Sequence, residues 1–163
     1  MDDTMQHTGP GPRVAVVCLG NICRSPMADV VLNARLAEAG ADVVVHSFGT
    51  ASWHVGKPMD ERSAATLSAR GYDATQHRAS HFTAAHAGAY DLVLAMDEAN
   101  HADLLAIGVP ADRLRRFRDF DPEPGDGNVP DPYYGGEEGF HDVLAMIERS
   151  ADAILAHVTG VRR

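Results

Sequence analysis

Short apolar runs separated by polar segments recur along the chain from residue 13 to residue 117. Each run is brief and rich in aliphatic side chains, which is typical of a buried β-strand. The last of the runs is the weakest. We therefore expect four strands, over residues 13–18, 42–48, 90–96 and 113–117.

Helical patterns lie between and after these runs. Three helices are expected over residues 26–38, 60–70 and 97–107. Each is followed within two residues by a glycine, the residue that most readily ends a helix in the left-handed conformation. Asp60 is the expected N-cap of the second helix. The clearest pattern comes last, because apolar residues there recur at three- and four-residue steps and build one stripe. That stripe contains Phe140, Val143, Leu144, Ile147, Ala151, Ile154, Leu155 and Val158.

Alternating strands and helices indicate an α/β fold with a parallel sheet covered on both faces. No internal repeat or second domain is visible, so residues 13–163 are expected to form one domain. Residues 1–12 are polar and end in Gly-Pro-Gly-Pro, which predicts a disordered tail. In parallel sheets, ligands bind beyond the carboxyl ends of the strands. Cys18 lies at such an end.

Composition narrows the functional classes. The formal charge is -9, which argues against a nucleic-acid-binding protein. No apolar run approaches the length of a membrane span, and we expect no membrane partner. The chain has only 2 cysteines and no apparent export signal, so a cytoplasmic protein is expected. The histidines are scattered without metal-ligand spacing, so neither a metal site nor a cofactor is expected.

The segment from Cys18 to Ser25, C-L-G-N-I-C-R-S, carries the most specific chemistry. A loop that closes on a helix N-terminus directs several backbone N–H groups at one point, which suits a phosphate group. Arg24 adds a planar fork of donors for two phosphate oxygens. The same donors favour the thiolate form of Cys18, which is the nucleophilic form. Pro26 is expected at the first position of the following helix.

Residues 17–26 match the pattern V-C-x-G-N-I-C-R-S-P throughout, and D-P-Y-Y-G stands intact at residues 131–135. With these two motifs the chain resembles the low-molecular-weight protein tyrosine phosphatase family. The resemblance implies a three-layer, doubly wound, flavodoxin-like fold with a four-stranded parallel sheet and helices on both faces. It also implies a cysteine-dependent phosphatase that acts as a monomer on tyrosine-phosphorylated proteins and releases inorganic phosphate.

The resemblance further implies roles for individual residues. Ser25 would hydrogen-bond the thiolate and assist its departure, although it could instead be the N-cap of the helix. Asn21 would lock the loop through Ser47 and His77, and a structural role for His77 is as reasonable as a catalytic one. The remaining expected substrate contacts are Leu19, Gly20, Ile22, Cys23, Trp53, His54, Tyr133 and Tyr134.

The departing phenolate needs a proton, which a carboxylic acid close to the ester oxygen can supply. Asp121, Asp126 and Asp131 compete for this role in a long loop. Asp131 is preferred because it alone precedes the Tyr-Tyr-Gly of the second motif. Trp53, in the loop after the second strand, and Tyr133 would flank the ring of a phosphotyrosine. Packing of Trp53 on the surface is the alternative.

Two positions in the loop refine the hypothesis. Related phosphatases for phosphoarginine carry threonine where this chain has Ile22, so isoleucine favours an aryl phosphate. Cys23 could form a reversible disulfide with Cys18, or it could be a small buried residue at the start of the helix. The absence of any cysteine after Cys23 counts against an arsenate reductase, and a Walker loop is excluded because G-K-[ST] is missing.

Overall fold

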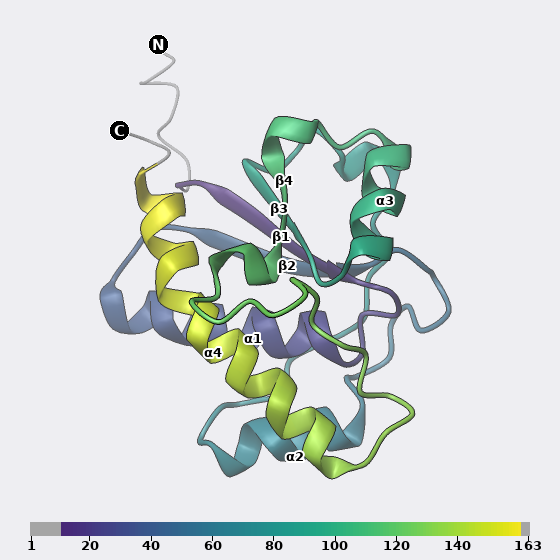
Figure 1. Ribbon diagram of the computed structural model, residues 1–163, viewed down its shortest axis with the longest axis vertical. Helices are drawn as coiled ribbons and strands as arrows, with labels where there is room; N and C mark the ends of the chain where they lie inside the picture. The colour runs from purple at the N-terminus through teal and green to yellow at the C-terminus, as the bar shows by residue number, and fades with distance from the viewer. Residues whose placement is uncertain (1–10, 161–163) are drawn as a thin grey trace.

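The computed structural model describes residues 11–160. Four parallel strands form one sheet in the order β2-β1-β3-β4, which confirms the predicted α/β fold (Figure 1). The first strand agrees with its predicted bounds, and the other three are shorter or begin later than expected. The strands are β1 (Arg13–Cys18), β2 (Val44–Gly49), β3 (Leu92–Ala95) and β4 (Leu114–Arg116).

The helices follow the predicted alternation with the strands. They are α1 (Arg24–Ala39), α2 (Glu61–Ala69), α3 (Glu98–Ile107) and α4 (Glu137–Gly160), and three short 3₁₀ turns are η2 (Ala84–His86), η3 (Ala111–Arg113) and η4 (Phe117–Phe120). Asp60 caps α2 as expected, by accepting a hydrogen bond from the Arg62 N–H. Pro26 is the third helical residue and not the first, because α1 already begins at Arg24. It still lies in the first turn, where an N–H has no intrahelical acceptor.

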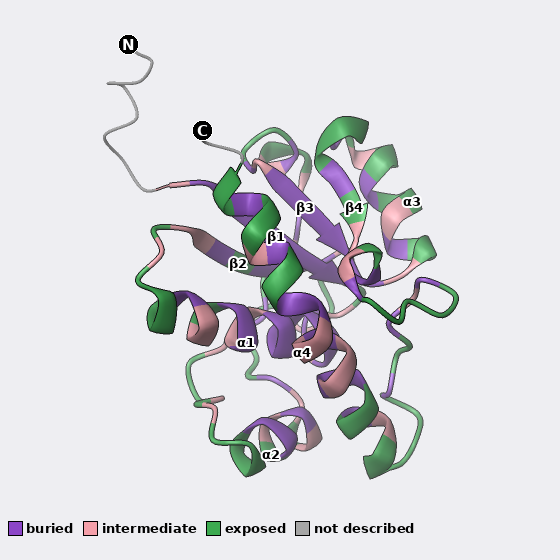
Figure 2. Cartoon of the chain, turned by 60° about the vertical axis from the view of Figure 1, so that its left-hand side comes forward, coloured by how far each residue is buried: buried purple, intermediate pink, exposed green. Residues whose placement is uncertain are grey.

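Helices cover both faces of the sheet and bury two apolar clusters (Figure 2). Alternate side chains of β1 divide between the clusters, since successive residues of a strand point to opposite faces. Val14 and Val16 pack with α1 and α4, while Ala15 and Val17 pack with Leu104 of α3. The predicted stripe of α4 is buried, except that Leu155 is only partly covered. The result is the expected three-layer arrangement.

The sheet order places the end of β1 where the chain reverses its direction of winding. The chain passes from β1 through α1 to β2 on one side, and it then returns across to β3 on the other side of β1. Loops that leave β1 and β3 therefore diverge to opposite faces and open a crevice at their carboxyl ends. Cys18 is the last residue of β1 and lies at this crevice.

The long loop that precedes α4 is built around an ion-pair network. The fully buried carboxylate of Asp121 is bonded by Arg118 at 3.0 Å and by Arg149 of α4 at 3.0 Å. Arg118 also donates to the carbonyls of Glu123 at 2.6 Å and Asn128 at 2.9 Å. Burial alone would raise the pKa of Asp121, but the bonds from Arg149, from the Glu123 N–H and from Arg118 outweigh burial and lower it. The carboxylate therefore stays charged and holds the base of the loop.

The predicted N-terminal tail lies outside the described residues for its first ten positions. Pro12, which the tail was expected to include, is already buried, and its carbonyl accepts a hydrogen bond from the Val44 N–H at 2.9 Å. Within residues 11–160, none of the helices combines the length and the apolar character that crossing a bilayer requires.

Candidate active site

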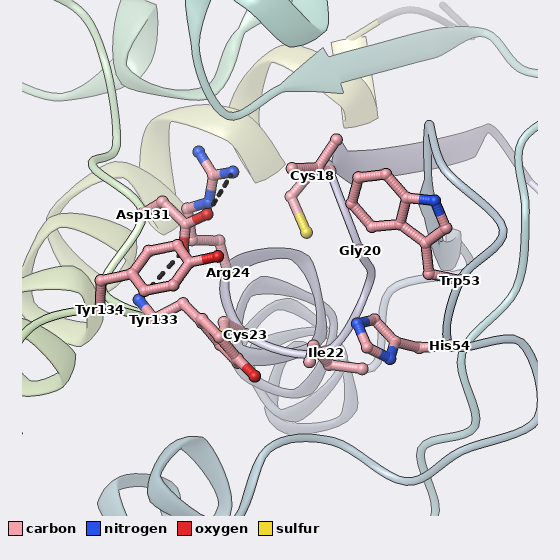
Figure 3. A pocket seen from close by; sticks show the side chains of 11 residues that line it. Cys18, Gly20, Ile22, Cys23, Arg24, Trp53, His54, Asp131, Tyr133 and Tyr134 are labelled. Carbon is pink, nitrogen blue, oxygen red and sulfur yellow. Dashed lines mark hydrogen bonds and ion pairs between the residues drawn. The ribbon is translucent and has the colours of Figure 1, made fainter.

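A cleft of about 180 Å³ opens at the carboxyl end of β1 (Figure 3). Three segments form its walls: the loop between β1 and α1, the loop after β2, and the long loop before α4. Most of the residues that the sequence singled out meet in this cleft. Its lining consists of Cys18, Leu19, Gly20, Ile22, Cys23, Arg24, Trp53, His54, Asp131, Tyr133 and Tyr134.

The loop between β1 and α1 turns at Asn21. Its φ of 57° is the only positive value among the non-glycine residues 11–160. For a residue with a side chain, this left-handed conformation is less stable than the right-handed one by about 1–2 kcal/mol of free energy. Three hydrogen bonds hold it in place. The side chain of Asn21 donates to Ser25 Oγ at 2.8 Å and accepts from the Ser80 N–H at 2.8 Å, while its backbone carbonyl lies 2.7 Å from His77 Nε2. Asn21 is thus a structural element of the loop.

The support of Asn21 was only partly anticipated. His77 does contact Asn21, from behind the loop, and it does not line the cleft. Ser47 was expected to take part, but the Asn21 side chain bonds Ser25 and Ser80 instead. Ser47 lies with His77 in a separate cavity behind the loop.

The sulfur of Cys18 is surrounded by hydrogen-bond donors. The Asn21 N–H donates to Sγ at 3.3 Å, and Ser25 Oγ lies 3.0 Å from Sγ. Ser25 Oγ accepts from Asn21, so its single proton goes either to Sγ or to the Phe48 carbonyl, which is 3.2 Å away. A thiolate would take that proton as a hydrogen bond. Ser25 is the second residue of α1 and the N-cap is Cys23, so the N-cap alternative for Ser25 is wrong.

Arg24 is held in the cleft by residues that are distant in the sequence. Its NH1 group donates to Asp97 Oδ2 at 2.6 Å and to the Val129 carbonyl at 3.0 Å, and its side chain is only 3% exposed. Asp97 also caps α3 through its other oxygen. The sequence pointed to Asp97 only as the start of a helix. A carboxylate at the carboxyl end of the strand beside β1 was the signal that could have identified it.

Asp131 is the one member of the three competing aspartates that lines the cleft. Its Oδ1 accepts from the Tyr133 N–H at 3.1 Å, and its Oδ2 lies 3.7 Å from Arg24 NH2. Asp121 is buried in the ion-pair network at the base of the loop. Asp126 is exposed and bonds the Asn128 N–H outside the cleft. Of the three aspartates, only Asp131 therefore lies in the cleft.

Aromatic side chains stand on two sides of the cleft (Figure 3). Trp53 lies on one side and is 68% exposed. Tyr133 and Tyr134 lie on the other, and their rings meet edge to face with centroids 4.9 Å apart. His54 lies so close to Gly20 that a Cβ there would come within 3.1 Å of its ring. Because Gly20 has no side chain, the imidazole of His54 can lie directly against the loop between β1 and α1.

Cys23 is buried in the same cleft, and both cysteines are free thiols. Burial, the charge of Asp60 and the proximity of Cys18 together raise the pKa of Cys23 to about 12. Its thiol is therefore protonated at neutral pH and is a weak nucleophile compared with a thiolate. The disulfide between Cys18 and Cys23 stays a prediction.

The pKa of His77 is lowered from its ordinary value of 6.5, because burial outweighs the favourable effects of the Asn21 carbonyl and Asp29. As the pH falls below 6.5, the unfolded chain gains a proton that the folded His77 still refuses, so stability is lost until the lowered folded pKa is reached. We expect His77→Gln, which can still donate to Asn21, to lack this loss. Urea unfolding between pH 7.5 and pH 5 compares the two. Equal pH slopes for both proteins would contradict the prediction.

No group of three or more histidine, cysteine, aspartate or glutamate side chains has a metal-binding arrangement within residues 11–160.

Comparison with known proteins agrees with this geometry. Residues 13–162 match the family model described as low molecular weight phosphotyrosine protein phosphatase. The chain is 49% identical over 140 residues to the low molecular weight protein-tyrosine phosphatase A of Mycobacterium tuberculosis, covering 83% of this chain and 84% of that protein.

Solved structures show the same fold. A protein tyrosine phosphatase from Entamoeba histolytica is 30% identical, with a TM-score of 0.87 over 94% of this chain and 100% of the other. A Drosophila arginine phosphatase is 28% identical, with a TM-score of 0.82 over 88% of this chain and 96% of the other. With a family model that spans nearly all of its length, the chain belongs to the low molecular weight phosphotyrosine protein phosphatase family.

Proposed function

We propose that this low molecular weight protein-tyrosine phosphatase hydrolyses protein phosphotyrosine in two steps, through a phosphocysteine on Cys18. In the first step the thiolate attacks phosphorus, the bond from phosphorus to the tyrosine oxygen breaks, and Asp131 protonates the leaving oxygen. In the second step water attacks phosphorus and gives its proton to Asp131, while the sulfur–phosphorus bond breaks and restores the thiolate. The observation that carries the proposal is the meeting of Cys18, Arg24 and Asp131 in one cleft.

The phosphate would be held by the start of α1 and by Arg24. The first N–H groups of a helix have no intrahelical acceptor, and they carry the positive end of the helix dipole. Asp97 and the Val129 carbonyl occupy the NH1 group of Arg24. This orientation fixes the guanidinium plane and leaves its other donors for the equatorial oxygens of phosphorus. Such donors stabilise the charge that develops in the transition state.

Ser25 would stabilise the departing sulfur in the second step. Its hydroxyl is 3.0 Å from Sγ and can turn its proton from the Phe48 carbonyl to the thiolate. This hydrogen bond becomes stronger as negative charge returns to the sulfur.

The aromatic walls support an aryl substrate. Trp53 and Tyr133 lie on opposite sides of the cleft, where they would enclose a planar ring. Ile22 also supports an aryl substrate. Its apolar side chain lines the cleft and offers no hydroxyl to a nitrogen leaving group. The fold alone does not distinguish phosphotyrosine from phosphoarginine as the substrate, because a solved arginine phosphatase has the same fold. The preference for phosphotyrosine thus rests on these side chains.

A substrate panel tests the proposal. We expect hydrolysis of a phosphotyrosine peptide to exceed that of matched phosphoserine and phosphoarginine peptides by at least about tenfold in kcat/KM, because those two cannot fill the aromatic cleft. Phosphate release by wild-type protein and by Cys18→Ser is the measurement, with the variant as the control for contaminating phosphatases. A preference for phosphoserine or phosphoarginine would overturn the assignment of the substrate.

A further inference from the structure

The Tyr133 wall of the cleft is supported from behind by Arg62, in the first turn of α2. The guanidinium carbon of Arg62 lies 5.3 Å from the centre of the Tyr133 ring and 4.6 Å from the centre of the Phe140 ring. Both distances are within the range of a cation–π interaction. Arg62 thereby links an element outside the cleft to the loop that carries Asp131 and to the start of α4.

Arg62 is itself held in a fixed orientation. Its Nε donates to Asp60 Oδ1 at 3.1 Å and its NH2 group donates to Asp60 Oδ2 at 3.0 Å. This two-point bond sets the plane of the guanidinium, which a single contact would not do. The Asp60 backbone N–H in turn donates to the Ile22 carbonyl at 2.8 Å. The support of Tyr133 is therefore anchored to the loop between β1 and α1 (residues 19–23), which we call the phosphate loop.

The two sides of the cleft differ in this respect. Tyr133 is 39% exposed and is in contact with Arg62 on one side and the edge of Tyr134 on another. Trp53 is 68% exposed, and within residues 11–160 it makes no comparable aromatic or cation–π contact. The Tyr133 side of the cleft is thus tied to other elements of the fold, whereas the Trp53 side is more exposed to solvent.

We propose that Arg62 is a positioning residue that determines specificity for aryl phosphates, by holding the Tyr133 ring at a set distance from the phosphate loop. The role rests on the proposed function, since it requires a substrate with a ring. Arg62 does not touch the reacting atoms. It acts through Tyr133, so its loss should weaken binding of the ring and leave binding of phosphate itself unchanged.

The test compares Arg62→Met with Arg62→Lys. Methionine keeps an apolar side chain of similar length over the two rings, and the cap of α2 survives because the backbone N–H of residue 62 still reaches Asp60. Lysine keeps the charge and loses the two-point bond to Asp60. Arg35→Met is the matched control, because Arg35 is an arginine paired with Asp152 on the remote part of α1.

For Arg62→Met we expect KM for a phosphotyrosine peptide to rise about 3- to 10-fold, the loss expected of one such contact. The competitive inhibition constant of inorganic phosphate should stay within about twofold, and so should kcat. Arg62→Lys should recover part of the KM, and Arg35→Met should match the wild type. Thermal unfolding checks that each variant is folded.

The outcomes separate the two proposals. An unchanged KM in an active, folded Arg62→Met overturns the role of Arg62 and leaves the proposed function intact. A parallel rise in the inhibition constant of phosphate also overturns it, because Arg62 would then support the phosphate loop through Asp60 and not the wall. A wild-type protein that prefers the phosphoserine peptide overturns both proposals.

Discussion

Replacing Cys18 by serine is expected to reduce kcat for a phosphotyrosine peptide by about 10⁴-fold or more. An alcohol is not ionised at neutral pH and needs a base to act as a nucleophile. The groups that contact the sulfur are the Asn21 N–H and the Ser25 hydroxyl, and neither can accept the proton of an attacking alcohol in this arrangement. A serine at this position would therefore sit in the phosphate loop without reacting.

Cys23→Ser is the matched control, because it makes the same exchange in the same cleft. The raised pKa of Cys23, about 12, keeps its thiol protonated, so we expect this variant to retain kcat within a few-fold. Steady-state phosphate release measures both variants. Trapping of a phosphoprotein on acid quench should occur in wild type and in Cys23→Ser and should be lost in Cys18→Ser. A fully active Cys18→Ser would contradict the phosphocysteine mechanism.

Asp131→Asn is expected to lower kcat for the phosphotyrosine peptide by about 10²- to 10⁴-fold, the usual contribution of a general acid. Asparagine can still accept the Tyr133 N–H at Oδ1, so the local turn should persist while the transferable proton is removed. The loss in kcat/KM, which reports the first step alone, should be much smaller for an aryl phosphate whose phenolate is stable without a proton, such as 4-nitrophenyl phosphate. That contrast identifies proton transfer as the missing step.

Asp126→Asn provides the control for Asp131, since Asp126 belongs to the same loop and bonds the Asn128 N–H outside the cleft. It should leave both substrates nearly unaffected. The comparison requires kcat/KM for the two substrates with each variant, together with the pH profile. An equal loss of kcat/KM on both substrates for Asp131→Asn would mean that Asp131 orders the cleft, for instance through Arg24, and does not donate a proton.

The sequence was most informative about features that depend on residues close together in the chain. The bounds of β1 were predicted correctly, and the helix that follows it begins two residues earlier than expected, because strand and helix formation depend largely on neighbouring residues. Asn21 could be identified as a residue able to adopt a left-handed conformation. The order of the sheet then brings the end of β1 to the crevice, so the position of the site also followed.

The sequence was least informative about partners that are far apart in the chain. The bonds of Arg24 to Asp97 and Val129 depend on how two loops dock on the sheet, and no local pattern encodes this. The prediction for Ser47 was wrong for the same reason, because the position of a side chain across the sheet decides which partner it reaches. Among the three aspartates of the long loop, the second motif favoured Asp131, but the burial of Asp121 in an ion-pair network could not be predicted from the sequence.

The partners of Arg24 also have a consequence for biosynthesis. They lie 73 and 105 residues further along the chain, at Asp97 and Val129. During translation Cys18 leaves the ribosome early, but the guanidinium cannot be oriented until the segment through Val129 has emerged and docked. A nascent or truncated chain would therefore expose a phosphate loop without a working catalytic centre. Orientation of Arg24 thus requires that the chain has been made and folded at least through Val129.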